Sequence, residues 1–182
     1  MKIITAIFFY LIVVLMAIMP FFLMYLLSDL LAFLLCRVFK YRKAVIIKNL
    51  KGCFPEKADR EIKEMLPNVY RNLTDNILEG IKAFSMSKRQ IIRRHKIINT
   101  ELVEEYFNQG KSIIAVTGHY NNWEWGSLSA SLQTSFNVVG IYKPLSNKMV
   151  DSFVRWSRQK CGTLLAPINQ TAKTFEKYKD IP

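Results

Sequence analysis

Two consecutive stretches decide the fold, Ser112-Ile113-Ile114-Ala115-Val116-Thr117 and Gly118-His119-Tyr120-Asn121-Asn122-Trp123-Glu124. The first stretch is apolar and rich in β-branched side chains, which is typical of a buried strand. A helical pattern over residues 123–132 follows, so the second stretch is predicted to form the turn between strand and helix. In α/β sheets, ligands bind at the carboxyl ends of strands, and this turn places His119 there.

Strands and helices alternate through the C-terminal part of the chain, which favours an α/β fold with a helix-covered, mainly parallel sheet. Three strands make a small sheet without a closing element, and we expect that the sequence is truncated at its C-terminus. Besides those named above, the predicted elements are helices over residues 101–108, 147–160 and 171–178 and strands over residues 136–142 and 163–167.

Upstream of this region, apolar residues recur at helical spacing over residues 62–84, with a break or kink expected near Pro67. A connector is expected over residues 41–58 and a basic turn or short helix over residues 88–96. The chain therefore divides into three parts. These are a membrane anchor helix (1–39), a basic connector with a helical segment (40–98) and a partial α/β domain (99–182).

The N-terminus is the most apolar part of the chain. Residues 3–27 carry no charge, and about 20 apolar residues suffice to cross a bilayer. Pro20 and Asp29 predict a kinked helix, whose last turns, to about Phe39, leave the bilayer and run along its surface. Basic residues without an acidic one come next, and the positive-inside rule then places the C-terminal domain in the cytoplasm. They are Arg37, Lys40, Arg42, Lys43, Lys48 and Lys51.

The formal net charge of +12 lies outside the apolar N-terminus. Such a charge suggests anionic lipid headgroups, acidic proteins or nucleic acid as partners. Stacking aromatic residues are not spaced through the basic segments, which disfavours nucleic acid. The three cysteines, Cys36, Cys53 and Cys161, form no metal-binding spacing and no disulfide framework, so we expect reduced, packed thiols.

His119 and Glu124 are the candidate catalytic pair. On one continuous helix, residues five apart lie about 140° apart and do not meet. If His119 lies in the turn and Glu124 in the first turn of the helix, the carboxylate can reach one imidazole nitrogen. The other nitrogen is then available to take a proton from an alcohol. The spacing alone also allows a structural histidine, and His95, in a basic run, is expected to be an ordinary surface residue.

With these residues the chain resembles the late acyltransferases of lipid A biosynthesis, the Kdo-lipid A lauroyl and myristoyl transferases, in the glycerolipid acyltransferase group with the His-x4-Asp/Glu motif. The resemblance covers nearly the whole chain. It also includes the basic segment from Arg42 to Pro55, the helix with Asn72, Asp75 and Glu79, and residues 141–147.

The resemblance implies transfer of a fatty acyl chain from acyl carrier protein to a hydroxyl of a lipid A precursor, on the cytoplasmic face of the bacterial inner membrane. His119 is the implied general base and Glu124 its partner, with no cofactor and no metal. Arg158, with Arg155 as the alternative, is carried over as a contact to a phosphate or the developing oxyanion. Lys143 stands where the family commonly has Arg, so the charge is kept but not the two-pronged fork.

Other readings of the sequence stay open. Asn122 is a candidate substrate-binding residue, although turn chemistry explains it equally well. The acceptor could be another glycolipid or a phospholipid. A non-catalytic, membrane-tethered fragment that binds anionic lipid explains the anchor and the charge, but not a His/Glu pair at the end of a strand.

Overall fold

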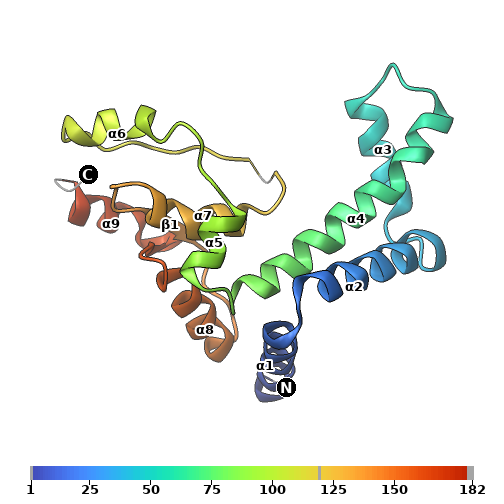
Figure 1. The fold of residues 1–182 in the computed structure, drawn as a ribbon, viewed down its shortest axis with the longest axis horizontal. Helices are drawn as coiled ribbons and strands as arrows, with labels where there is room; N and C mark the ends of the chain where they lie inside the picture. Colours follow the sequence, from blue (N-terminus) through green and yellow to red (C-terminus); the bar gives the residue numbers. More distant parts are fainter. Residues whose placement is uncertain (1, 119, 180–182) are drawn as a thin grey trace. The chain divides into compact units, whose positions relative to one another are not determined.

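A computed structural model describes residues 2–118 and 120–179 and is mostly helical (Figure 1). The chain divides into two compact units, which we call the sheet unit (residues 1–17 and 82–182) and the helical unit (18–81). The α-helices are α1 (Lys2–Ile18), α2 (Phe21–Phe33), α3 (Lys43–Cys53), α4 (Asp59–Ala83), α5 (Lys88–Arg94), α6 (Glu101–Asn108), α7 (Trp123–Gln133), α8 (Lys148–Gln159) and α9 (Thr171–Tyr178). The strands are β1 (Val139–Tyr142) and β2 (Leu164–Pro167), with a π-helical turn η1 (Leu34–Val38) and a 3-10 turn η2 (Ile168–Gln170).

In the helical unit, α2 and η1 lie beside α4 (Figure 1). The core between them contains Ala32, Cys36, Leu66 and Tyr70, and apolar residues of α3 pack against it. The Tyr70 hydroxyl donates a 2.7 Å hydrogen bond to the carbonyl of Tyr41, which fixes the chain between η1 and α3. The connector expected over residues 41–58 therefore contains a helix, α3. Of the break or kink expected near Pro67, the break is wrong, because α4 continues through that residue, and the kink stays a prediction.

In the sheet unit, β1 and β2 pair in parallel with Val139 opposite Leu164 and Tyr142 opposite Pro167. Helix α8 makes the crossover between them, as parallel pairing requires. The α/β class is thus represented by a small two-stranded parallel sheet in a mostly helical chain.

The buried strand predicted over residues 112–117 is wrong for the described structure. This segment has no regular secondary structure, and the side chains of Ile114 and Val116 are 81% and 93% exposed. A strand needs a neighbour to accept its backbone hydrogen bonds. Within residues 2–118 and 120–179 the only strands, β1 and β2, pair with each other.

The apolar N-terminus is divided at Met19 and Pro20, where α1 ends and α2 begins. This is the position at which the sequence predicts a kink. Residues 21–38 form a helical stretch that is long and apolar enough to cross a membrane, judged by length and composition, and α1 is a shorter apolar helix. The domain boundaries at residues 39 and 98 stay a prediction.

Candidate functional site

The N-terminus of α7 forms the framework of the candidate site. Asn122 caps the helix, since its side-chain oxygen accepts a 3.3 Å hydrogen bond from the backbone N–H of Trp125. Asn121, just before it, adopts a positive φ of 50°, a conformation that asparagine tolerates well. Glu124 therefore lies in the first helical turn, where the helix dipole stabilises a negative charge.

Glu124 is held by Arg158, which lies in the last turn of α8. The guanidinium Nη2 lies 2.6 Å from Glu124 Oε1, and Nε donates a 3.3 Å hydrogen bond to Oε2. The two side chains are 31% and 29% exposed, so the pair is partly shielded from water. Two-point contacts of this kind fix the orientation of a carboxylate as well as its charge. The pair thus presents Glu124 in one defined position at the start of α7.

Thr163, the residue just before β2, holds α7 in place beside this ion pair. The Thr163 hydroxyl donates to the carbonyl of Ser127 at 3.1 Å and lies 2.9 Å from the hydroxyl of Ser131. Gly162 precedes Thr163 with a φ of 104°, and a Cβ on it would lie 3.5 Å from the Ser131 side chain. A side chain at position 162 would be strained by that backbone conformation. The glycine therefore lets the chain turn from α8 into β2 close to α7.

The other predicted site residues occupy different surroundings. His119 lies outside the described residues. Arg155 faces Asp151 one turn away on α8, with Nε 3.4 Å from Oδ2, so Arg158 and not Arg155 meets Glu124. Lys143 follows β1 directly and is exposed. The structure thus brings Glu124 and Arg158 together, 34 residues apart in sequence.

His95 was expected on the surface, and the structure places it half-buried between α5 and α7. Its Nδ1 lies 2.7 Å from the Ser129 hydroxyl, and its carbonyl accepts a 2.9 Å hydrogen bond from Gln133. Ser129 is fully buried, so it is not open to a substrate, and the contact joins α5 to α7. Nothing in the basic sequence around His95 signals these tertiary contacts.

Two lysines cap helix ends within the sheet unit, and sequence analysis missed both. Lys160 Nζ donates to the carbonyls of Ala83, Phe84 and Met86 at 2.8, 3.0 and 2.9 Å, at the C-terminus of α4. Lys82 Nζ donates to two carbonyls in the last turn of α1. Burial lowers the pKa of both lysines, and the nearby Arg94 charge lowers the pKa of Lys82 further. A cation at a helix C-terminus satisfies carbonyls that lack an intrahelical partner.

The prediction that the cysteines are packed thiols is confirmed for two of the three residues. Cys36 and Cys161 are buried, and Cys53 is exposed. Burial raises the pKa of the Cys161 thiol, although the charge of Lys160 lowers it in part. Among the described residues, no group of three or more His, Cys, Asp or Glu side chains is placed to hold a metal ion.

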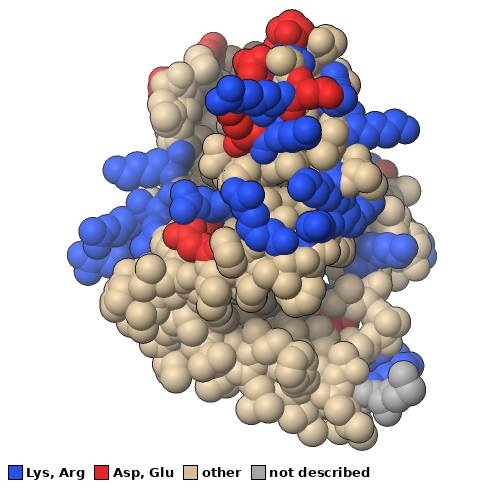
Figure 2. Space-filling model, turned by 90° about the vertical axis from the view of Figure 1, so that its right-hand side faces the viewer, with Lys and Arg blue, Asp and Glu red and all other residues tan. Residues whose placement is uncertain are grey.

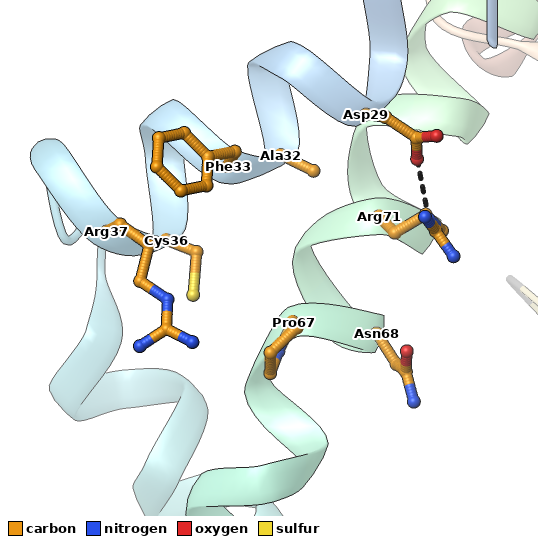
Figure 3. A pocket seen from close by; sticks show the side chains of 8 residues that line it. All are labelled: Asp29, Ala32, Phe33, Cys36, Arg37, Pro67, Asn68 and Arg71. Atoms are coloured by element: carbon orange, nitrogen blue, oxygen red, sulfur yellow. Dashed lines mark hydrogen bonds and ion pairs between the residues drawn. The ribbon is translucent and has the colours of Figure 1, made fainter. Parts of the chain in front are cut away.

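A pocket of about 300 Å³ lies in the helical unit, at the end of α2 (Figure 3). Arg71 closes one side, where its Nε lies 2.6 Å from Asp29 Oδ1 (Figure 3). Arg37 and Cys36 line it from η1, so it is bordered by cationic as well as apolar groups. The lining residues are Asp29, Ala32, Phe33, Cys36, Arg37, Pro67, Asn68 and Arg71.

Comparison with known proteins decides the family. The family profile described as bacterial lipid A biosynthesis acyltransferase matches residues 1–179. This chain belongs to that family. Among curated proteins, the chain is similar to the lipid A biosynthesis lauroyltransferase of Escherichia coli K12, with 26% identity over 122 residues, 67% of this chain and 39% of that protein. It is also similar to two lipid A biosynthesis acyltransferases of Haemophilus influenzae, with 26% and 27% identity over 63% of this chain and 36% of each protein.

Membership of the lipid A acyltransferase family confirms the resemblance on which the sequence analysis rests. The matched region spans less than two fifths of the E. coli relative's length. No solved structure matches the chain. The family is thus one of acyltransferases that act in bacterial lipid A biosynthesis.

Proposed function

We propose that this chain takes part in transferring a fatty acyl group from the thioester of acyl carrier protein to a hydroxyl of a lipid A precursor. The observation that supports this function is the Glu124–Arg158 ion pair, which fixes a carboxylate five residues after His119 at the start of a helix. The family match supports a lipid A precursor as the acceptor.

In the proposed reaction, His119 accepts the proton of the acceptor hydroxyl as the oxygen attacks the thioester carbonyl. The new C–O bond forms a tetrahedral oxyanion, and its collapse breaks the C–S bond. The carrier thiolate leaves and takes the proton from the imidazolium. Glu124 stabilises the positive charge on His119 while the proton resides there. No covalent acyl-enzyme and no cofactor enter this scheme.

Arg158 was assigned from the sequence to a phosphate or to the oxyanion of the substrate. Its contact with Glu124 supports a different role, in which it positions the carboxylate that acts on His119. Lys143 remains the candidate for contact with the phosphates of the acceptor, and the pairing of Arg155 with Asp151 argues against that role for Arg155. Asn122 serves as the helix cap, and its contact with substrate stays a prediction.

The partners follow from the same proposal. The resemblance to the family implies acyl carrier protein, an acidic protein, as the acyl donor. Its negative charge complements the net charge of +12 on this chain. The acceptor is an anionic lipid, so we place the enzyme at the cytoplasmic face of the bacterial inner membrane, with its basic residues toward the headgroups.

The test measures the transfer of labelled acyl chain from acyl carrier protein to a lipid A precursor. A general base contributes about 10²–10⁴-fold, so His119→Ala should lose activity by that factor. Glu124→Ala should lose less, and the double variant should be hardly worse than His119→Ala, because residues acting as one unit are not additive.

Two controls sharpen this test. Circular dichroism should show that His119→Ala keeps the helical content of the parent. Arg155→Ala, on the same helix as Arg158 but paired with Asp151, should keep most activity. Near-normal acyl transfer by His119→Ala would show that His119 is not the general base. If the enzyme acylates a lysophospholipid in preference to the lipid A precursor, the acceptor is a phospholipid and not a lipid A precursor.

A further inference from the structure

Both ends of α1 are hydrogen-bonded to the C-terminal part of the sheet unit, residues 82–182. Asn147 Nδ2 donates to the carbonyl of Lys2 at 2.8 Å. At the other end, Lys82 Nζ donates to the carbonyls of Met16 at 2.6 Å and Ala17 at 3.1 Å. The helix has 17 residues and is therefore about 25 Å long. If α1 crossed a hydrocarbon core of about 30 Å, these two contacts of one compact unit would have to lie at opposite faces of the bilayer.

The middle of α1 also lies against the sheet unit. The Tyr10 hydroxyl donates to the carbonyl of Met149 at 3.1 Å. The ring of Phe9 packs edge-on against the rings of Phe84 and Phe153, with centroids 5.6 and 5.8 Å apart. One side of α1 is therefore in contact with protein from its first turn to its last, which leaves the other side to the surroundings.

In the helical unit, the middle of α2 makes polar contacts with α4. These contacts include a hydrogen bond to a carboxylate, a buried hydroxyl pair and an ion pair. They are Tyr25 Oη to Glu79 Oε1 at 2.6 Å, Ser28 Oγ to Thr74 Oγ1 at 2.9 Å and Arg71 Nε to Asp29 Oδ1 at 2.6 Å.

These contacts decide against α2 as a membrane-crossing helix. Helix α4 would enter the bilayer beside it and bring Arg71, Asp75 and Glu79 into hydrocarbon. A charged side chain at the centre of a bilayer is costly, so such residues are rare on helices that cross a membrane. The side chains of the Arg71–Asp29 ion pair are 58% and 46% exposed, so both charges are open to water and not shielded by protein.

Each of the two helices nevertheless keeps one uncovered apolar face. On α1 the exposed apolar residues recur at helical spacing. On α2 they do so as well, on the side of the helix that faces away from Ser28 and Ala32. On α1 they are Ile4, Phe8, Leu11, Leu15 and Ile18, which are 51–75% exposed, and on α2 they are Phe22, Leu26, Leu30 and Phe33, which are 55–66% exposed.

Basic residues follow the apolar face of α2 directly. Arg37, Lys40 and Arg42 are exposed. Figure 2 shows Lys and Arg gathered in a band next to a broad area of uncharged surface. An apolar helix face flanked by cations matches the boundary between acyl chains and anionic headgroups. The pocket lined by Arg37 and Arg71 lies at this same end of α2 (Figure 3).

We propose that α1 and α2 both lie in the plane of one leaflet of an anionic bilayer, with the N-terminus and the rest of the chain on the same side of the membrane. The apolar faces enter the acyl-chain region, and the basic residues contact headgroups. This inference rests on the membrane location in the proposed function, but not on the acyl-transfer chemistry. It replaces the membrane crossing over residues 3–27 that the sequence suggests.

Native Cys53 provides an internal reference for a labelling experiment, because it is exposed in the helical unit while Cys36 and Cys161 are buried. A short cysteine-containing tag is added at the N-terminus, and a Cys53→Ser version separates the two signals. Cys53→Ser without the tag gives the background from the buried thiols. The protein is expressed in bacteria, and sealed inner-membrane vesicles of both orientations are treated with a membrane-impermeant maleimide.

We expect the tag and Cys53 to react in the same vesicle orientation, inside-out, and to be protected in the other until detergent is added. Labelling of the tag in right-side-out vesicles, with Cys53 labelled only in inside-out ones, would overturn the inference and restore a crossing helix. Recovery of the chain as a soluble oligomer would also overturn it, because a second copy would then cover the apolar faces. Acyl transfer in detergent, measured separately, reports on the chemistry whichever result is obtained.

Discussion

Glu124 and Arg158 are the residues that the structure places together at the candidate site. Sequence analysis found both of them, but it assigned Arg158 to the substrate because a contact between residues 34 positions apart has no local signature. The helix cap at Asn122 and the position of Glu124 in the first turn follow from short-range chemistry and were predictable. The pairing of α7 with α8 depends on the tertiary packing through Thr163.

The contact predicts energetic coupling between Glu124 and Arg158. We expect Arg158→Ala to reduce acyl transfer, since the carboxylate loses its fixed position. The Glu124→Ala/Arg158→Ala double variant should be less impaired than the product of the single effects, with a coupling energy in the usual range of about 0.5–3 kcal/mol. A double-mutant cycle on kcat/KM measures it, with Arg155→Ala in place of Arg158→Ala as the additive control. If the losses from Glu124→Ala and Arg158→Ala are additive, Arg158 contacts the substrate and does not position Glu124.

Lys160 is the second residue whose role can be measured directly. Lys160→Met leaves three carbonyls at the end of α4 without their donor, and hydrogen bonds to a charged group are worth about 1.5–3 kcal/mol each at most. We expect the free energy of unfolding by urea to fall by about 1–3 kcal/mol at pH 7. The matched control is Lys179→Met, which removes an exposed lysine paired with Glu176 and should change little.

The same variant tests the lowered pKa of Lys160. Between that lowered pKa and the ordinary lysine value, the unfolded chain holds a proton that the folded chain has released, so stability rises with pH in this window. The unfolding free energy of the parent minus that of Lys160→Met should therefore increase as the pH rises toward 10. A difference that stays constant with pH would show that the lysine titrates normally in the fold.

At the scale of elements, local periodicity predicted most helices well. The predicted helix over residues 101–108 has the bounds of α6, and those of α8 and α9 agree within a residue. Residues 112–117 have strand composition, but a strand exists only where a partner accepts its hydrogen bonds, and composition contains no information about that partner. Helix α3 was missed because its apolar residues, Ile46, Ile47 and Leu50, are few and only partly buried.

The apolar face of α2 makes a prediction at this scale. Leu26→Asp should lower binding to vesicles that contain anionic lipid by about tenfold or more, because burial of a leucine side chain is worth about 1.5–3 kcal/mol. Leu102→Asp on α6 is the matched control, since Leu26 is 62% and Leu102 is 61% exposed. Vesicle flotation measures both variants. Equal loss in the two would mean that α2 has no special contact with lipid.

For the molecule as a whole, the sequence predicted an apolar N-terminus and a cationic remainder, and did not predict the division into two compact units. That division separates α1 from α2 at Ala17 and Ile18, next to Pro20. It depends on which helices meet in space. Residues 2–17 pack with the chain beyond residue 82, so the order of the sequence is a poor guide to the units.

The net charge of +12 predicts how the molecule meets its partners. Exposed charges farther apart than about 8 Å are largely screened at physiological ionic strength. Binding to acyl carrier protein and to anionic vesicles should therefore weaken strongly as salt is raised. Surface plasmon resonance with immobilised acyl carrier protein and flotation at low and high salt measure the two contacts. Salt-independent binding to the carrier would point to an apolar interface.

The exposed run Ser112–Thr117 has a consequence for handling the protein. It is uncharged, β-prone and free of proline, and Ile114 and Val116 are almost fully open to solvent. Segments of this kind stack between chains into cross-β aggregates. The isolated chain should therefore form thioflavin-positive fibrils at high concentration, and Ile114→Lys should delay them by placing a charge in every layer. Val45→Lys, at an exposed apolar position on α3, should leave the lag time unchanged.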